Sequence, residues 1–302
     1  MNKIETKELK MKNRLIGFVL FFQINFLFPV LSFLFFIRRL FFCTVICLAA
    51  CSSVPKGPVE TFTIRKMTEN QLEMANKELD RGNYEKALEQ LGEARRMAVS
   101  IDDPSQLIRT SLAYSNIYFY LGQYDEAVQY WKEALAEAEL SGETELAALT
   151  RIYQIRAQLL NKEIPASDVP ALIEKELSSI TKDRLGIALG WTVTGLAEKE
   201  LAHWDEAEAA LRKALKIHEQ DRYLEQAAYD YYLIASVYSV SGRYDDAVES
   251  LHLAIAFDRR SENSYGLAMD WFALGEVYKK AGRSEESNAA YTRSENIKNS
   301  MQ

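Results

Sequence analysis

The stretch Gly82-Asn83-Tyr84-Glu85-Lys86-Ala87 decides the fold, because the chain repeats its pattern at a fixed distance. The pattern is a small residue, an aromatic residue two positions later, acidic residues and then alanine. Later copies are Gly122-Gln123-Tyr124-Asp125-Glu126-Ala127, Ala202-His203-Trp204-Asp205-Glu206-Ala207, Gly242-Arg243-Tyr244-Asp245-Asp246-Ala247 and Gly282-Arg283-Ser284-Glu285-Glu286-Ser287. Successive copies start 40, 80, 40 and 40 residues apart. This constant period predicts an array of stacked repeats, with a degenerate copy in the double-length gap.

Each block predicts the corner between two helices. The glycine ends the first helix and permits a tight turn, and the aromatic residue packs into the angle between the helices. The acidic residues lie in the first turn of the second helix, where the helix dipole favours negative charge. The alanine lets the two helices approach closely. The positions with these structural roles are Gly82, Tyr84, Ala87, Gly122, Tyr124, Ala127, Trp204, Ala207, Gly242, Tyr244, Ala247 and Gly282.

The window 148–187 is the degenerate copy. A helix is expected over residues 145–161, but a stretch containing Pro165 replaces the glycine-aromatic corner. We expect Asp168 to cap a second helix that has Pro170 in its first turn and ends near residue 180. The break is either drift in a structural repeat or a loop that reshapes the binding surface.

These blocks resemble the tetratricopeptide repeat, although the usual period in that family is about 34 residues. The resemblance covers nearly all of residues 60–299. It implies an all-α fold, namely a right-handed α-solenoid of about six helix pairs. The expected units are 68–107, 108–147, the degenerate 148–187, 188–227, 228–267 and 268–299.

The N-terminal part resembles a bacterial lipoprotein signal. Arg38-Arg39 precede an apolar run over residues 40–47, and Leu48-Ala49-Ala50-Cys51 follows. The last four residues resemble a lipobox, which implies that residues 1–50 are a signal peptide and that Cys51 is lipidated. Residues 51–59 would then be the lipidated cysteine and its tether. The alternative is an ordinary buried cysteine in an apolar segment.

A second apolar run, over residues 15–37, is longer than a signal peptide needs and long enough to span a bilayer. One explanation is that translation begins nearer Arg38, so that the run is an extension outside the natural protein. The other is that the run is a transmembrane anchor and the lipobox is fortuitous. We favour the first and leave residues 1–50 out of the fold prediction.

The composition of residues 51–302 narrows the class of function. Residues 1–50 hold 7 of the 36 Lys and Arg and 2 of the 43 Asp and Glu, which leaves 29 basic and 41 acidic residues and a net charge of −12. This acidic excess argues against a nucleic-acid partner, because phosphates demand a basic surface. All three cysteines lie at or before Cys51, so no disulfide is expected in the body.

No catalytic or metal-binding pattern is evident in the sequence. His203, His218 and His252 lie in different units or at opposite helix ends, and no pair of His or Cys has metal-ligand spacing. No phosphate-binding loop or nucleophile motif occurs. The chain is therefore expected to be no enzyme and to hold no cofactor and no metal.

The family resemblance implies a binding surface instead. In this family the first helix of each pair lines the concave face, where aromatic residues are good anchors for a protein or peptide partner. The matching positions are Leu72, Asn76, Leu112, Asn116, Phe119, Tyr229, Tyr232 and Phe272, and Lys199 and Ser236 occupy further groove positions. Some family members clamp a C-terminal carboxylate with a lysine at the position of Leu72, so that clamp is not expected here.

Together these observations predict a membrane-anchored lipoprotein that acts as a scaffold for envelope proteins. Ser52 after the cysteine resembles an outer-membrane address, so we expect the protein at the outer membrane of a Gram-negative bacterium, facing the periplasm. One alternative is a periplasmic binding protein for a small or lipid-like ligand that accompanies a transporter. Others are a protein anchored by residues 15–37 and an envelope enzyme with an unrecognised site.

Overall fold

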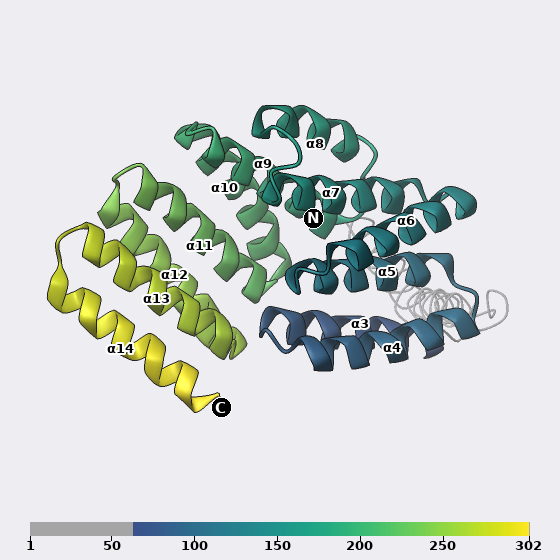
Figure 1. The fold of residues 1–302 in the computed structure, drawn as a ribbon, viewed down its shortest axis with the longest axis horizontal. Coiled ribbons are helices and arrows are strands. Elements are labelled where there is room, and N and C mark those ends of the chain that lie inside the picture. Colours follow the sequence, from purple (N-terminus) through teal and green to yellow (C-terminus); the bar gives the residue numbers. More distant parts are fainter. Residues whose placement is uncertain (1–62, 302) are drawn as a thin grey trace, which may run out of the picture. The chain divides into compact units, whose positions relative to one another are not determined.

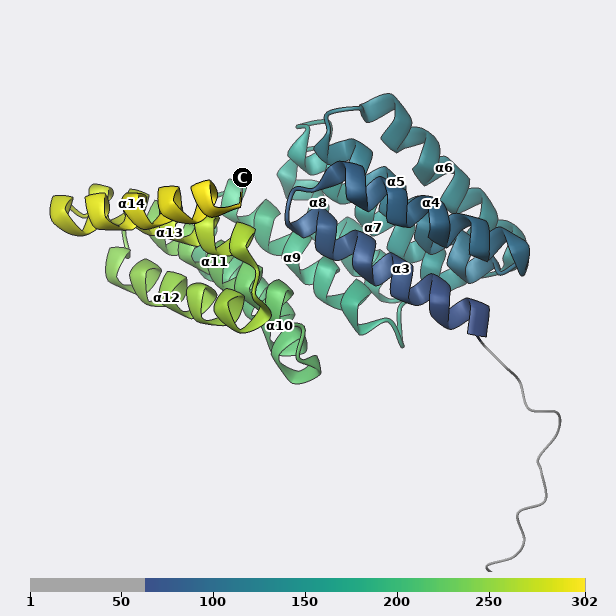
Figure 2. The same cartoon turned by 90° about the horizontal axis from the view of Figure 1, so that it is seen from below.

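The computed structural model describes residues 63–301, and every regular element in this range is helical. The helices pack as consecutive pairs that follow one another from α3–α4 to α13–α14 (Figure 1, Figure 2). The first three pairs comprise α3 (Thr63–Asp80), α4 (Tyr84–Ser100), α5 (Pro104–Tyr120), α6 (Tyr124–Ser141), α7 (Thr144–Leu160) and α8 (Val169–Leu177). The others comprise α9 (Arg184–Glu200), α10 (Trp204–Asp221), α11 (Leu224–Val240), α12 (Tyr244–Ser261), α13 (Ser264–Lys280) and α14 (Ser284–Ser300). This arrangement confirms the predicted all-α solenoid.

The corner after the first helix has the same backbone conformation in every pair. Residues 82, 122, 162, 202, 242 and 282 have φ angles from 60° to 82°, the left-handed region that glycine adopts most easily. Glycine occupies four of these positions, and Lys162 and Ala202 occupy the other two. A residue with a side chain pays about 1–2 kcal/mol for this conformation. The degenerate unit therefore keeps its corner at Lys162 although the sequence motif is lost there.

Small residues allow the helices to approach closely. Ala87, Ala127, Ala207 and Ala247 have no exposed surface. A Cβ atom added to Gly195 would lie 2.6 Å from Cγ of Leu211, so the leucine packs directly on the α9 backbone. The larger buried side chains fill the space around these contacts and form three core clusters along the described part of the chain.

The degenerate unit consists of a full first helix and a shortened second one. Residues 166–168 form a 3₁₀ turn, η2, that leads into α8. Pro170 lies in the first turn of α8, as expected, but the helix ends at Leu177. The side chain of Asp168 accepts no backbone N–H, so the predicted cap is absent. The 3₁₀ turn directs the chain into α8 instead.

Two pairs of ionisable side chains are buried at equivalent positions of successive units. Between α10 and α11, Nδ1 of His218 lies 2.6 Å from Oδ2 of Asp230. Forty residues further on, Asp258 of α12 and Asp270 of α13 occupy the same places, each 3% exposed. The carboxylate of Asp258 sits over Gly266, where a Cβ atom would collide with it. Among the described residues no cation pairs with these two carboxyl groups.

The folded structure keeps the carboxyl groups of Asp258 and Asp270 partly protonated near neutral pH. Burial raises the pKa of Asp258 to about 7, opposed by a hydrogen bond from Asn263, and the charge of Glu225 adds to the rise. Burial also raises the pKa of Asp270 to about 9, reinforced by the neighbouring charge of Asp258. In the unfolded chain both groups titrate near the ordinary aspartate value of about 3.9.

Replacing one of these carboxyl groups should flatten the pH dependence of stability. Between about pH 4 and pH 9 the folded protein binds more protons than the unfolded chain, so its stability falls as the pH rises. Asp270→Asn removes one titrating group, and we expect a smaller loss of melting temperature between pH 5 and pH 9. Asp205→Asn, at an exposed position on α10, is the matched control. Equal pH dependence in Asp270→Asn and the wild type would contradict the assignment.

Candidate interaction surface

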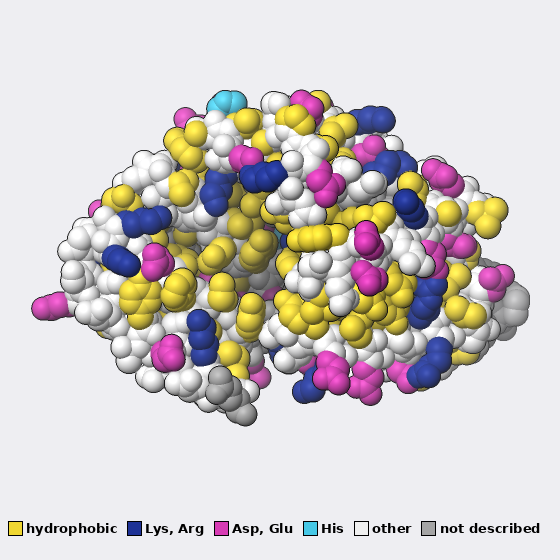
Figure 3. All heavy atoms as spheres, in the orientation of Figure 1, with side chains coloured by type: hydrophobic (Ala, Val, Ile, Leu, Met, Phe, Trp, Pro, Cys, Tyr) yellow, Lys and Arg dark blue, Asp and Glu magenta, His cyan; other side chains and the backbone are white. Residues whose placement is uncertain are grey.

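The first helices of the pairs face a shared interior. Arg156 of α7 interacts electrostatically with Tyr120 of α5 and with Tyr229 of α11, although α9 lies between α7 and α11 in the stack. A Cβ atom at Gly82 would lie 3.4 Å from the ring of Tyr265, which is at the start of α13. The first pair therefore reaches the later pairs across the interior. Figure 3 shows the resulting hollow between the earlier and the later helices, with many hydrophobic side chains on its walls.

Two of the predicted groove residues lie in the core. Leu72 is 8% exposed and Leu112 is 4% exposed, and both pack among other buried aliphatic side chains. They hold helices together and are not available to a partner, which corrects the expectation for these positions. Asn76 is exposed on α3. Phe119 is partly buried, with its ring centroid 6.4 Å from that of Trp131 and 5.6 Å from that of Tyr124.

Asn116 belongs to a polar cluster around Arg156. Nη1 of Arg156 donates to Oδ1 of Asn116 at 3.3 Å, and Nη2 donates to the hydroxyl of Tyr120. The guanidinium carbon lies 5.5 Å from the centre of the Tyr120 ring. These neighbours are neutral, and no carboxylate pairs with Arg156 among the described residues. The cluster borders a small recess lined by Asn116, Phe119, Trp131, Tyr153, Arg156 and Ala157.

The predicted aromatic residues of the later units lie on the first helices, where Tyr229 and Phe272 are exposed and Tyr232 is partly buried. Tyr229 and Tyr232 of α11 stack with their ring centroids 6.2 Å apart, and Tyr229 is 46% exposed. Desolvation by the surrounding chain raises the pKa of Tyr229. Phe272 of α13 is 43% exposed and packs one edge near Tyr291, with 5.5 Å between the ring centroids. These rings offer apolar surface to a partner.

Two lysines of the first helices, Lys199 and Lys280, interact electrostatically with each other. Nζ of Lys199 on α9 donates to the hydroxyl of Ser236 on α11. Nζ of Lys280 on α13 donates to the hydroxyl of Ser239 at 3.2 Å. Burial lowers the pKa of Lys199, and the positive charge of Lys280 lowers it further. Neither lysine pairs with a carboxylate in the described part of the chain.

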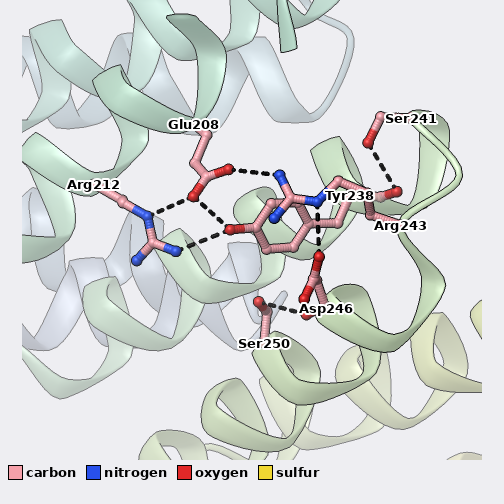
Figure 4. A network of polar contacts seen from close by, with 7 residues as sticks. All are labelled: Glu208, Arg212, Tyr238, Ser241, Arg243, Asp246 and Ser250. Carbon is pink, nitrogen blue, oxygen red and sulfur yellow. Dashed lines mark hydrogen bonds and ion pairs between the residues drawn. The ribbon is translucent and has the colours of Figure 1, made fainter. Parts of the chain in front are cut away.

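The charges at the α10–α12 corner are arranged differently, because they neutralise one another (Figure 4). Glu208 accepts from Arg212 at 2.8 Å, from Arg243 at 3.1 Å and from the hydroxyl of Tyr238 at 2.5 Å. Arg243 also donates to Asp246 at 2.7 Å and lies over the Tyr238 ring, 4.1 Å from its centre. Part of the arrangement recurs one unit later, where Arg283 lies over the Tyr278 ring and bonds to Glu286. This recurrence indicates a structural role.

Within residues 63–301 the structure shows no cluster of His, Cys, Asp and Glu that could hold a metal ion. None of the helices in that range is long and apolar enough to cross a membrane. The predicted lipidation site Cys51, the tether and the apolar run at residues 15–37 lie outside the described residues.

Sequence reasoning missed Arg156 and Lys280. Arg156 follows Asn116 by one 40-residue period, as Asn116 follows Asn76, so the register of the repeat could have found it. The sequence offered no comparable signal for Lys280, because its importance comes from the approach of α13 to α9 and α11 in space.

Comparisons with known proteins agree with this geometry. A family model described as tetratricopeptide repeat matches residues 115–139. A search of curated proteins finds no match. The solved structure of BtubC (BKLC) from P. vanneervenii is similar, with 19% identity, a TM-score of 0.53, and 78% of this chain and 92% of that chain covered. The apo form of RapI has 14% identity, a TM-score of 0.54, and 78% and 67% coverage.

A Rap protein complexed with Competence and Sporulation Factor is also similar, with 15% identity, a TM-score of 0.50, and 78% of this chain and 75% of that chain covered. At these identities the likeness concerns the fold alone. The matched segment runs from Ser115 in α5 into α6, and it contains the block at residues 122–127 whose pattern recurs along the chain. The chain thus contains one segment that matches the tetratricopeptide-repeat model, and the block inside this segment recurs along the helical array.

Proposed function

We propose that the solenoid is a scaffold for protein–protein interaction whose interior holds a segment of a partner protein. The observation that carries this proposal is the group of rings at Tyr229, Tyr232 and Phe272 on the first helices of the later pairs, of which Tyr229 and Phe272 are exposed and Tyr232 is partly buried. Aromatic residues of this kind dominate the binding energy at protein interfaces. A similar fold in a Rap protein is complexed with Competence and Sporulation Factor, which supports the proposal.

A photo-crosslinking residue at position 232 should capture the partner in cells. We expect crosslinked species from this position and none from position 256, where Ala256 is exposed on the second helix of the same pair. Both variants are compared by immunoblotting and mass spectrometry. Identical adducts from the two positions, or adducts from neither, would contradict a partner held in the interior.

We further propose that Cys51 anchors this scaffold to the outer membrane, on the periplasmic side. The support is the sequence Leu48-Ala49-Ala50-Cys51 behind a basic and apolar segment, followed by Ser52. The several acyl chains of a lipoprotein cysteine hold a soluble body stably at a membrane surface, whereas one chain binds only marginally.

Intact mass and membrane fractionation of Cys51→Ala test this anchor. We expect the wild-type protein to begin at a lipidated Cys51, and the variant to lose the added lipid mass and the processing at this residue. Cys47→Ala, in the same segment, is the matched control and should be processed normally. A full-length, unlipidated wild-type species in the membrane fraction would contradict the lipoprotein proposal and favour residues 15–37 as the anchor.

A further inference from the structure

The carboxyl groups of Asp258 and Asp270 share a buried site between α12 and α13. They are hydrogen-bonded to each other. Apart from this bond, Oδ2 of Asp270 has no hydrogen-bond partner in the described part of the chain. A hydrogen bond between two carboxyl groups needs a proton on one of them, because an ionised carboxylate only accepts. The packing of α12 on α13 is therefore the packing of a pair that holds a proton.

The corner that leads into α13 leaves little room around this pair. Nδ2 of Asn263 donates to Oδ1 of Asp258 at 3.1 Å, and Oδ1 of Asn263 accepts from the backbone N–H of Gly266 at 3.0 Å. A Cβ atom at Gly266 would lie 1.9 Å from Oδ2 of Asp258. The position of the Asp258 carboxyl group thus fixes the first turn of α13.

The same first turn of α13 meets the first helix pair. The ring of Tyr265 lies against the backbone of Gly82, where a Cβ atom would be 3.4 Å from Cε2. Tyr84, the first residue of α4, also interacts electrostatically with Tyr265. This contact joins the earlier helices to the later ones, on the two sides of the hollow in Figure 3. The turn that the buried pair positions therefore also holds the two sides together.

The other ionisable groups around the pair come from α11 and α3. On α11, the negative charge of Glu225 acts on Asp258, and the hydroxyl of Tyr232 interacts with Asp270. The α3 residues that interact with Glu225 in turn are Arg81, Lys77 and Glu73. Because no cation pairs with the two carboxyl groups within residues 63–301, ionisation of both leaves like charges facing each other in a buried site, which is unfavourable.

We propose that Asp258 and Asp270 form a proton-dependent latch, which holds the first helix pair against α13 and thereby controls access to the interior. Loss of the shared proton to solvent separates the two carboxyl groups, shifts the first turn of α13 and withdraws Tyr265 from Gly82. This inference rests on the proposed scaffold function and adds its regulation.

The latch closes at low pH and opens at high pH. Burial raises the pKa of Asp258 to about 7 and that of Asp270 to about 9. Since the closed state binds the proton more tightly than an open state does, closure is complete at low pH and is lost as the pH rises through this range. One unit earlier His218 stands opposite Asp230, with Nδ1 and Oδ2 2.6 Å apart, so no second carboxyl group repels the first.

Hydrogen exchange measured by mass spectrometry tests the latch on the full chain purified in detergent. Protection factors, which correct for the intrinsic exchange rate, are compared at pH 6 and pH 9 for peptides that cover residues 258–270 and 78–90. We expect protection in both peptides to fall together, by up to about tenfold per pH unit, because opening releases one proton. Residues 218–230, where a histidine replaces one carboxyl group, should change little.

Two variants separate the latch from a local titration. Asp270→Asn keeps a donor toward Asp258 without an ionisable proton, so both peptides should keep nearly the same protection at pH 6 and pH 9. Tyr265→Ala, at a position that is 39% exposed, removes the contact and keeps the pair. In this variant residues 258–270 should stay pH-dependent, and residues 78–90 should lose their pH dependence.

The matched control is Asp205→Asn, at an exposed position on α10, which should behave like the wild type. Thermal melting shows that each variant is folded. If Asp270→Asn does not fold, Tyr265→Ala decides the question, because it changes an exposed contact and leaves the buried pair intact.

Constant protection of both peptides between pH 6 and pH 9 would overturn the inference. A pH-dependent segment 258–270 beside an unchanged segment 78–90 would also overturn it, because the pair would then titrate without moving the first helix pair. Equal loss in all three peptides would do the same, since it would report global unfolding. Partner crosslinks from position 232 without these changes would leave the scaffold standing and remove only the latch. A working latch without such crosslinks would contradict the scaffold alone.

Discussion

The close approach of two helices at a residue without a long side chain is the contact on which the rest of this structure depends. At Gly195 the α9 backbone touches Leu211, and at Gly275 the α13 backbone touches Tyr291 in the same way. Fully buried alanines such as Ala207 and Ala247 serve the same purpose on the facing helices. Because these contacts set the angle of each pair, they also set which residues of the first helices reach the interior.

Charged side chains at the α10–α12 corner and on the interior-facing helices differ in their interaction partners. At the α10–α12 corner each charged group meets an opposite charge, and Tyr238 lies among them. On the interior-facing helices the hydrogen-bond partners of Arg156 and Lys199 are neutral side chains.

The repeat and its corners could be predicted from sequence because they depend on local chemistry. Glycine at positive φ, acidic first turns and small residues at contacts are visible in the printed residues. Lys162 shows the limit, since it keeps the left-handed corner with no sequence signal. Leu72 and Leu112 show a second limit of sequence-based prediction, because both are core residues that were assigned to the groove. A groove position and a core position on one helix differ by about one-third of a turn, and sequence spacing alone does not separate them well.

The burial of Asp258 and Asp270 as a pair could not be predicted from the sequence, for a further reason. Acidic residues near helix ends are common and usually exposed. Only the packing of α12 on α13, with Gly266 leaving room for a carboxylate, brings these two groups together. Lys280 likewise joins Lys199 only through the folded array.

The most direct test of the account is the free energy of unfolding of Ala247→Arg beside Ala256→Arg, both on α12. Ala247 is fully buried in the contact between helices and Ala256 is exposed. The account predicts a loss above about 3 kcal/mol for Ala247→Arg, because a large unpaired charge would have to enter a packed contact. It predicts a change within about 0.5 kcal/mol for Ala256→Arg. Similar stability of the two variants would contradict the claim that close contact at small residues holds the array together.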